Sequence, residues 1–174
     1  MVKILVCGDV EGRYAETFKR VAKLDKKAGP FDALFCVGAF YGDDKSVPAA
    51  PIPTYILDGE AGEVAENVTA LGACGATTIE ERKGGAGAKH LSVAFVADEG
   101  SIKPLEDACA TAGFMGVDVL LSCDWPRGVD VGVADSEVEQ LAEVGVRINA
   151  AGTDRIAECA KMCRPRYHFA GTRN

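Results

Sequence analysis

Three continuous apolar runs in the first sixty residues predict buried β-strands. They cover residues 2–9, 31–40 and 52–59, and the first is apolar on both alternating faces apart from Lys3. Strands that are apolar on both faces are typical of a parallel sheet that is covered on both sides. The amino-terminal third of the chain is therefore expected to build such a sheet.

Apolar residues at helical spacing follow the first strand. Between residues 12 and 29 they form one stripe, and the segment ends in lysines and Gly29, as helices often do. Three further helices are predicted. One covers residues 102–113, one begins at Ser136, and one follows the apolar stripe from Ile156 to Cys163.

Shorter apolar runs predict four further strands, over residues 67–72, 89–98, 116–126 and 164–171. Strands that alternate with helices favour an α/β fold in which helices cover the sheet. The sequence contains no internal repeat and no low-complexity linker. A single domain is therefore expected over residues 1–174.

The composition is that of a globular domain, with 174 residues, 48% of them apolar and 26% charged. The net charge of −7 argues against broad binding to nucleic acid, which needs many basic side chains against phosphates. The segment 161–174 has four basic residues and no acid, so a weak local contact with RNA remains open. Because no apolar run approaches the roughly 20 residues of a membrane span, no membrane contact is expected.

Seven cysteines, an odd number, are scattered through apolar segments and do not suggest a disulfide framework. Cys7 and Cys36 fall in predicted strands, whereas Cys109, Cys159 and Cys163 fall on apolar helix faces. We interpret them as small buried hydrophobic residues in a reducing, intracellular compartment.

Candidate chemistry lies just beyond the carboxyl ends of the strands, where ligands bind in open α/β sheets. These ends read GDVEG, VGAFYG, LDGEAG, SCDWPRG and YHFAGTRN, at residues 8–12, 37–42, 57–62, 122–128 and 167–174. Their order and spacing resemble the metallophosphoesterases, whose strands end in Gly-Asp-x-His, Gly-Asp, Gly-Asn-His-Glu, a His and His-x-His. That resemblance implies a calcineurin-like layered α/β fold with sheets flanked by helices. In that family, imidazole and carboxylate ligands hold two metal ions that activate a water.

Most metal ligands of that family are absent from the matching positions. Asp9 is retained, but Glu11 stands where the first motif has His, and Ala39 replaces the bridging aspartate. In the third strand end, Gly59 and Glu60, after Asp58, stand in place of Asn-His. In the fourth, Cys123, before Asp124, replaces the His, and the His-x-His positions hold Thr172 and Asn174. The chain has only two histidines, His90 and His168. The resemblance therefore implies that the two-metal site is lost and that no catalytic residue remains.

The remaining acids and one thiol are expected near one sheet edge: Asp9, Glu11, Asp58, Glu60, Cys123 and Asp124. One interpretation is a site for a single Mg²⁺ or Ca²⁺ ion near Asp9 and Glu11, since these cations prefer oxygen ligands. The other is that the acids are solvated, cap helices or pair with Arg13, Arg127 or Arg166. We favour the second interpretation, with no bound metal or cofactor, because a decayed motif leaves acids without a ligand role.

Longer stretches of the sequence make the family resemblance more specific. SCDWPRG resembles the Ser-His-Asp-Trp-Pro-Arg-Gly loop of the lariat debranching enzymes, with Cys123 in place of His. KILVCGDVEGR, FDALFCVGAF and PRYHFAG resemble the amino-terminal domains of CwfJ-type splicing proteins, and the match runs from Val2 to Gly171. This resemblance implies a nuclear domain of the intron-lariat spliceosome, with spliceosomal proteins and the lariat debranching enzyme as partners. Members of that group continue into carboxy-terminal CwfJ domains, so a chain shortened at its carboxyl end is expected.

Four residues near the same edge are candidates for contact with RNA or a partner: Trp125, Arg127, Arg166 and His168. An aromatic ring on a basic loop binds unstacked nucleotides, but a lone tryptophan more often covers the core. His168 alternates with Tyr167 and Phe169 in the last strand, so the imidazole is expected on the face opposite the two rings. We interpret it as a hydrogen-bonded structural histidine.

Three functions are compatible with these features. The first is a catalytically inactive metallophosphoesterase-like domain that acts as a protein-interaction module in splicing. The second is a phosphodiesterase that uses one metal ion or substituted ligands such as Glu11 and Cys123. The third is a structural subunit of another large intracellular assembly, since a fold does not fix a function.

Overall fold

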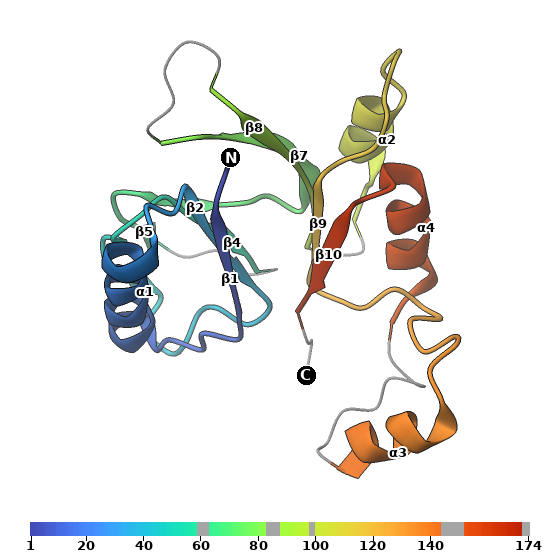
Figure 1. The fold of residues 1–174 in the computed structure, drawn as a ribbon, viewed down its shortest axis with the longest axis horizontal. Helices are drawn as coiled ribbons and strands as arrows, with labels where there is room; N and C mark the ends of the chain where they lie inside the picture. The colour runs from blue at the N-terminus through green and yellow to red at the C-terminus, as the bar shows by residue number, and fades with distance from the viewer. Residues whose placement is uncertain (59–62, 83–87, 98–99, 144–151, 172–174) are drawn as a thin grey trace.

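The computed structural model describes residues 1–58, 63–82, 88–97, 100–143 and 152–171. Strands and helices alternate along this part of the chain (Figure 1). In chain order, the elements are β1 (Ile4–Gly8), α1 (Tyr14–Ala28), β2 (Ala33–Val37), β3 (Ser46–Val47), β4 (Thr54–Leu57), β5 (Glu63–Val64), β6 (Val68–Ala70), β7 (Cys74–Glu80), β8 (His90–Val96), α2 (Lys103–Cys109), β9 (Val119–Ser122), α3 (Asp135–Glu143), α4 (Asp154–Cys163) and β10 (Tyr167–Ala170).

Two four-stranded sheets form the centre of the molecule (Figure 1). The first has the strand order β1-β2-β4-β6 and is parallel throughout. The second has the order β10-β9-β8-β7 and is parallel except for the β7–β8 pair. A separate parallel pair joins β3 and β5.

Each sheet is covered by helix on one face and by the other sheet on the other face. Helix α1 packs on the first sheet, whereas α2 and α4 pack on the second (Figure 1). The predicted layered α/β fold with sheets flanked by helices is thus confirmed. Within the described ranges, no helix has the length and hydropathy needed to cross a membrane.

Strand β2 shows why the predicted strands are apolar on both faces. All five of its residues are buried. Leu34 and Cys36 pack in the cluster with α1, whereas Phe35 and Val37 pack in the cluster between the two sheets. Full burial of a large apolar side chain contributes roughly 1.5–3 kcal/mol. Both faces of β2 therefore stabilise the position of the loop that follows it.

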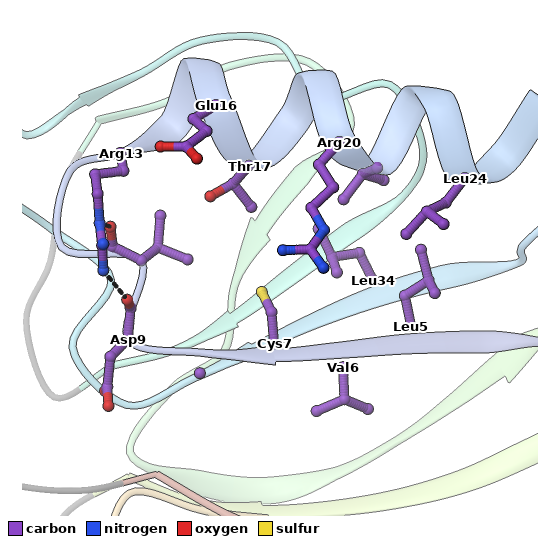
Figure 2. A pocket seen from close by; sticks show the side chains of 13 residues that line it. Leu5, Val6, Cys7, Asp9, Arg13, Glu16, Thr17, Arg20, Leu24 and Leu34 are labelled. Atoms are coloured by element: carbon purple, nitrogen blue, oxygen red, sulfur yellow. Dashed lines mark hydrogen bonds between the residues drawn. The ribbon is translucent and has the colours of Figure 1, made fainter.

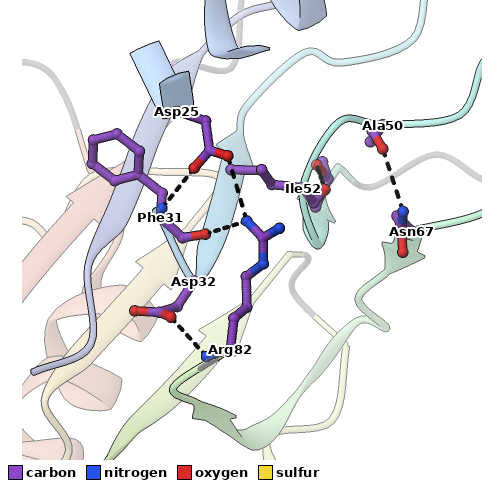
Figure 3. Close-up of polar contacts among 8 residues, drawn as sticks. Asp25, Phe31, Asp32, Ala50, Ile52, Asn67 and Arg82 are labelled. Atoms are coloured by element: carbon purple, nitrogen blue, oxygen red, sulfur yellow. Dashed lines mark hydrogen bonds and ion pairs between the residues drawn. The ribbon is translucent and has the colours of Figure 1, made fainter. Parts of the chain in front are cut away.

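Asp32 ties the start of the first sheet to the end of β7 (Figure 3). Its Oδ2 accepts a hydrogen bond from the Lys3 amide at 2.6 Å, and its Oδ1 accepts one from the Arg82 amide at 2.7 Å. The Arg82 guanidinium also donates to the Phe31 carbonyl at 2.7 Å. This buried carboxylate accepts two backbone N–H groups, so its role is structural.

Some elements differ from the sequence prediction. Strand β7 is not predicted, because only one of its faces is buried and it opens with a cysteine, a glycine and an alanine. Helix α2 ends at Cys109, before the predicted stop at Gly113. Helix α3 begins at Asp135, and the amide of Glu137 already donates to the Ala134 carbonyl. Ser136 therefore lies inside the first turn and does not open the helix.

Candidate functional site

The carboxyl ends of several strands converge at one edge of the two sheets. Gly38, which follows β2, has a φ of 95° and approaches Gly171, which follows β10. A Cβ atom at Gly171 would stand 2.5 Å from the Gly38 Cα, so a side chain there would clash with backbone. The two sheets therefore meet by close backbone contact at the edge where the sequence predicts the ligand site.

The loops after β1 and β2 are joined by backbone hydrogen bonds. The Glu11 amide donates to the Ala39 carbonyl at 3.1 Å, and the Gly12 amide donates to the Phe40 carbonyl at 2.9 Å. Ala39 is the residue that the resemblance described above aligns with the bridging aspartate. These bonds fix its loop against the turn that carries Asp9.

Asp9 and Asp58 accept three consecutive backbone N–H groups of the same loop. Asp9 has a φ of 35°, and its Oδ1 accepts a hydrogen bond from the Ala39 amide at 3.0 Å. Asp58 follows β4, and its Oδ2 accepts from the amides of Phe40 at 2.9 Å and Tyr41 at 3.3 Å. Backbone amides that donate to a carboxylate satisfy its acceptor oxygens within the protein. Both acids thus hold the loop that contains Ala39.

Glu11 forms an ion pair with Arg13, with 3.2 Å between Oε2 and the guanidinium. Arg13 also donates to the carbonyls of Asp9 at 3.0 Å and Val10 at 3.2 Å, so it clamps the turn after β1 (Figure 2). The predicted pairing of a remaining acid with Arg13 is confirmed. Because both side chains are more than half exposed, the pair contributes at most about 1 kcal/mol.

Cys123 and Asp124 make contacts within the protein at the end of β9. The buried Cys123 thiol donates to the Leu57 carbonyl at 3.3 Å, which links the ends of β9 and β4. The Asp124 carboxylate accepts from the amide of the next residue, Trp125, at 2.9 Å. Both side chains therefore support the backbone of the strand ends.

The described residues do not present the ligand set of a two-metal centre. Within the ranges given above, no group of three or more His, Cys, Asp or Glu side chains is placed to hold a metal ion. Ala39 has no donor side chain, and Asp9 and Asp58 accept backbone N–H groups. Three further predicted cleft residues lie outside the described residues, namely Glu60, Thr172 and Asn174.

The loop after β9 is attached to the start of α4. The Thr153 amide donates to the Trp125 carbonyl at 2.9 Å, and the Arg127 amide donates to the Thr153 carbonyl at 3.0 Å. The indole Nε1 of Trp125 is buried and has no hydrogen-bond partner among the described residues. That edge of the ring therefore faces protein and not solvent. This burial of the indole nitrogen favours the covering role of Trp125 over base stacking.

Two of the arginines that the sequence analysis paired with cleft acids have other partners. Arg127 lies 2.8 Å from Asp154 in the first turn of α4, and Arg166 lies 3.7 Å from Asp118. Asp154 is well placed there because the amino end of a helix favours a negative charge. Of the three arginines named as alternatives, Arg13 pairs with a cleft acid, whereas the ion pairs of Arg127 and Arg166 are with Asp154 and Asp118.

His168 is held by Ser122 on the neighbouring strand. Its Nε2 lies 2.7 Å from the Ser122 hydroxyl, and that hydroxyl donates to the Asp124 carbonyl at 2.7 Å. Since the single hydroxyl proton is used there, Nε2 must donate to the Ser122 oxygen. Burial lowers the pKa of His168 below its ordinary value, so the ring is neutral near pH 7. The interpretation as a hydrogen-bonded structural histidine is confirmed.

Sequence reasoning missed a cavity of about 400 Å³ between β1 and α1 (Figure 2). It forms where α1 crosses the outer side of β1, the terminal strand of the first sheet. Asp9 and Arg13 border it, as does Cys7, whose Sγ lies 3.4 Å from that of Cys36. The two cysteines are the next-to-last residues of β1 and β2.

The thiols of the chain differ in their proton affinities. The hydrogen bond with Cys36 lowers the pKa of Cys7, although burial opposes this shift. The same hydrogen bond and burial raise the pKa of Cys36. Burial raises the pKa of Cys159 to about 11 and also raises the pKa of Cys163. The thiols on α4 are therefore neutral at physiological pH.

Comparison with known proteins finds no family model that matches the chain. CWF19-like protein 1 of Homo sapiens is 31% identical over 206 residues, which cover 97% of this chain and 35% of that protein. The homologue of the same name in Caenorhabditis elegans is 33% identical, again over 97% of this chain and 34% of its own length. Zinc finger CCCH domain-containing protein 64 of Arabidopsis thaliana is 30% identical over 98% of this chain and 34% of its own length. The chain spans about a third of the length of these relatives. Over nearly all of its own length, it is similar to proteins named CWF19-like protein 1.

Proposed function

We propose that this chain is a metallophosphoesterase-like domain without phosphoesterase activity, and that it acts by binding proteins in pre-mRNA splicing. One observation carries the first half of the proposal. The carboxylates of Asp9 and Asp58 accept the three N–H groups of residues 39–41, at the position where Ala39 lacks the bridging carboxylate.

The absence of activity rests on the chemistry of two-metal hydrolysis. That reaction needs ligands that hold two cations a few ångströms apart, so that a bound water is deprotonated and the developing charge is stabilised. Ala39 offers no such ligand, Glu11 pairs with Arg13, and the Cys123 thiol donates to a carbonyl. A scaffold with these contacts keeps its strand ends in place through hydrogen bonds within the protein.

The splicing role rests on resemblance and on relatives. The strand-end motifs resemble those of CwfJ-type splicing proteins, and the relatives carry the name CWF19-like protein 1. On this basis the chain is a nuclear protein whose partners are spliceosomal proteins and the lariat debranching enzyme. The net charge of −7 favours protein partners over the nucleic acid backbone.

A phosphodiesterase assay tests the first half of the proposal. The 174-residue chain is incubated with bis-(p-nitrophenyl) phosphate and Mn²⁺, and with Mg²⁺ in a parallel sample. We expect release of p-nitrophenol at the rate of the protein-free control. A metal-dependent rate that disappears in Asp9→Ala and persists in the surface variant Glu16→Ala would refute the proposal and favour the single-metal enzyme.

Affinity purification from nuclear extract tests the second half. The tagged chain is compared with a tagged, unrelated domain of similar net charge, and the retained proteins are identified by mass spectrometry. We expect spliceosomal proteins and the lariat debranching enzyme to be enriched. Reproducible enrichment of another assembly without any splicing protein would contradict the splicing role and favour the structural-subunit alternative.

A further inference from the structure

Cys7 and Cys36 form a matched pair of thiols across two neighbouring strands. β1 and β2 are parallel, and their register places Cys7 directly opposite Cys36. Both side chains lie on the face of the sheet that packs with α1. Their Sγ atoms are 3.4 Å apart, whereas a disulfide needs about 2.0 Å. A small shift of either side chain therefore brings the sulfurs to bonding distance.

The two thiols differ in their access to solvent. Cys7 is partly exposed and lines the cavity between β1 and α1, and Figure 2 shows its sulfur directed into this space. Cys36 is 1% exposed and lies behind it on the second strand. A reagent that enters the cavity meets Cys7 first, and Cys36 is then the nearest sulfur to the modified atom.

The walls of the cavity fit a small polar reagent. Its volume is about 400 Å³, and its lining includes Arg20 on α1 as well as the acids Asp9 and Glu16. The guanidinium of Arg13, at the same wall, is held by Glu11 and two carbonyls. In Figure 2 the Arg20 side chain extends from α1 toward β1 near the Cys7 sulfur. Guanidinium groups bind carboxylates by directed hydrogen bonds. A low-molecular-weight disulfide that carries carboxylates matches this arrangement.

Another thiol pair in the described residues lacks these properties. The Sγ atoms of Cys109 on α2 and Cys163 on α4 lie 3.8 Å apart, and Cys163 is fully buried. Neither lines the cavity beside β1. This pair serves as a matched internal control for thiol proximity without access to the cavity.

We propose that Cys7 and Cys36 form a thiol–disulfide exchange site for small carboxylate-bearing disulfides. The Cys7 thiolate attacks one sulfur of the incoming disulfide, and the other half leaves as a thiolate. The Cys36 sulfur then attacks the Cys7 sulfur, and its proton passes to the departing half of the small disulfide, which leaves as a thiol. The protein is oxidised by two electrons to a Cys7–Cys36 disulfide, and the small disulfide is reduced to two thiols.

Mass spectrometry of the 174-residue chain tests this site, with glutathione disulfide as the probe. The reduced protein is exposed to the probe near pH 7.5, quenched with N-ethylmaleimide and digested for peptide mapping. We expect a product lighter by two hydrogens that links the peptides of Cys7 and Cys36. Cys36→Ser should instead accumulate glutathione on Cys7, and Cys7→Ser should abolish the reaction. Cys163→Ser should react as the unchanged protein does.

A labelling measurement on the unchanged protein keeps the test independent of variant folding. With limiting iodoacetamide, Cys7 should be alkylated before Cys36, Cys159 and Cys163, and all should react equally once the protein is unfolded in urea. Exchange that proceeds unchanged in a folded Cys7→Ser variant would overturn the proposal. So would Cys7 labelling no faster than Cys36, or a first disulfide that joins Cys109 to Cys163.

Discussion

Replacement of Asp58 by asparagine tests whether this carboxylate has a structural role. Asp58 accepts hydrogen bonds from the amides of Phe40 and Tyr41. Hydrogen bonds to a charged group contribute roughly 1.5–3 kcal/mol each, and neutral ones about 0.5–1.5 kcal/mol. Asparagine keeps an acceptor oxygen but loses the charge, so two bonds weakened by about 1 kcal/mol each reduce the free energy of unfolding by about 2 kcal/mol. Asp58→Ala, which removes the acceptor, should cost about 4 kcal/mol.

Thermal unfolding followed by circular dichroism measures this loss. For a chain of this size, 1 kcal/mol lowers Tm by roughly 2–4 °C, so Asp58→Asn should lower it by about 4–8 °C. Asp32→Asn is the matched control, because Asp32 also accepts two backbone amides but lies away from the candidate site. The two variants should lose similar stability, with or without EDTA.

The opposite sign would refute the structural role of Asp58. Carboxylates kept for metal binding repel one another when no cation neutralises them, so removal of one charge then stabilises the fold. A rise in Tm for Asp58→Asn together with a fall for Asp32→Asn would therefore favour a retained metal site.

Two further predictions concern the contacts around the strand ends. Burial lowers the pKa of His168 in the folded protein, so near and below the ordinary value of about 6.5 the unfolded chain binds the proton more readily. The free energy of unfolding should therefore fall as the pH drops through 6.5, and it should fall by less in His168→Gln. Equal pH dependence in urea titrations of both proteins would contradict this. Gly171→Ala should cost about 2–3 kcal/mol, because its Cβ would stand 2.5 Å from the Gly38 Cα. Gly72→Ala, where nothing lies within 4 Å of the added atom, should be near neutral, and equal Tm values for the two variants would refute the close contact.

The strands and helices with strong patterns were predictable from the sequence. The run around Phe35 is apolar on both faces because a helix covers one face and a second sheet covers the other. The apolar pattern does not reveal that the second face is covered by a sheet, because apolar side chains pack equally well against a helix or a sheet. Strand β7 was not predicted because apolar and polar residues alternate only weakly along it. Its pairing with β8, a tertiary contact, stabilises the strand instead.

The candidate site was predictable as a set of positions and less so as a set of contacts. The motifs place Asp9, Ala39 and Asp58 at neighbouring strand ends, and the structure brings them together. Composition cannot show that the acids accept backbone amides, because those donors come from loop geometry. For the same reason the motifs do not single out Arg13 from Arg127 as the partner of a cleft acid, since Asp154, the partner of Arg127, is supplied by the start of α4.

Calorimetric titration of divalent cations into the 174-residue chain tests the central claim most directly. The claim is that hydrogen bonds within the protein have taken the place of metal coordination around Asp9 and Asp58. Mn²⁺, Mg²⁺ and Ca²⁺ are each titrated into the unchanged chain and into Asp9→Ala. Only the heat of dilution is expected for all three ions in both proteins. Stoichiometric binding of any of them, lost in Asp9→Ala, would contradict it.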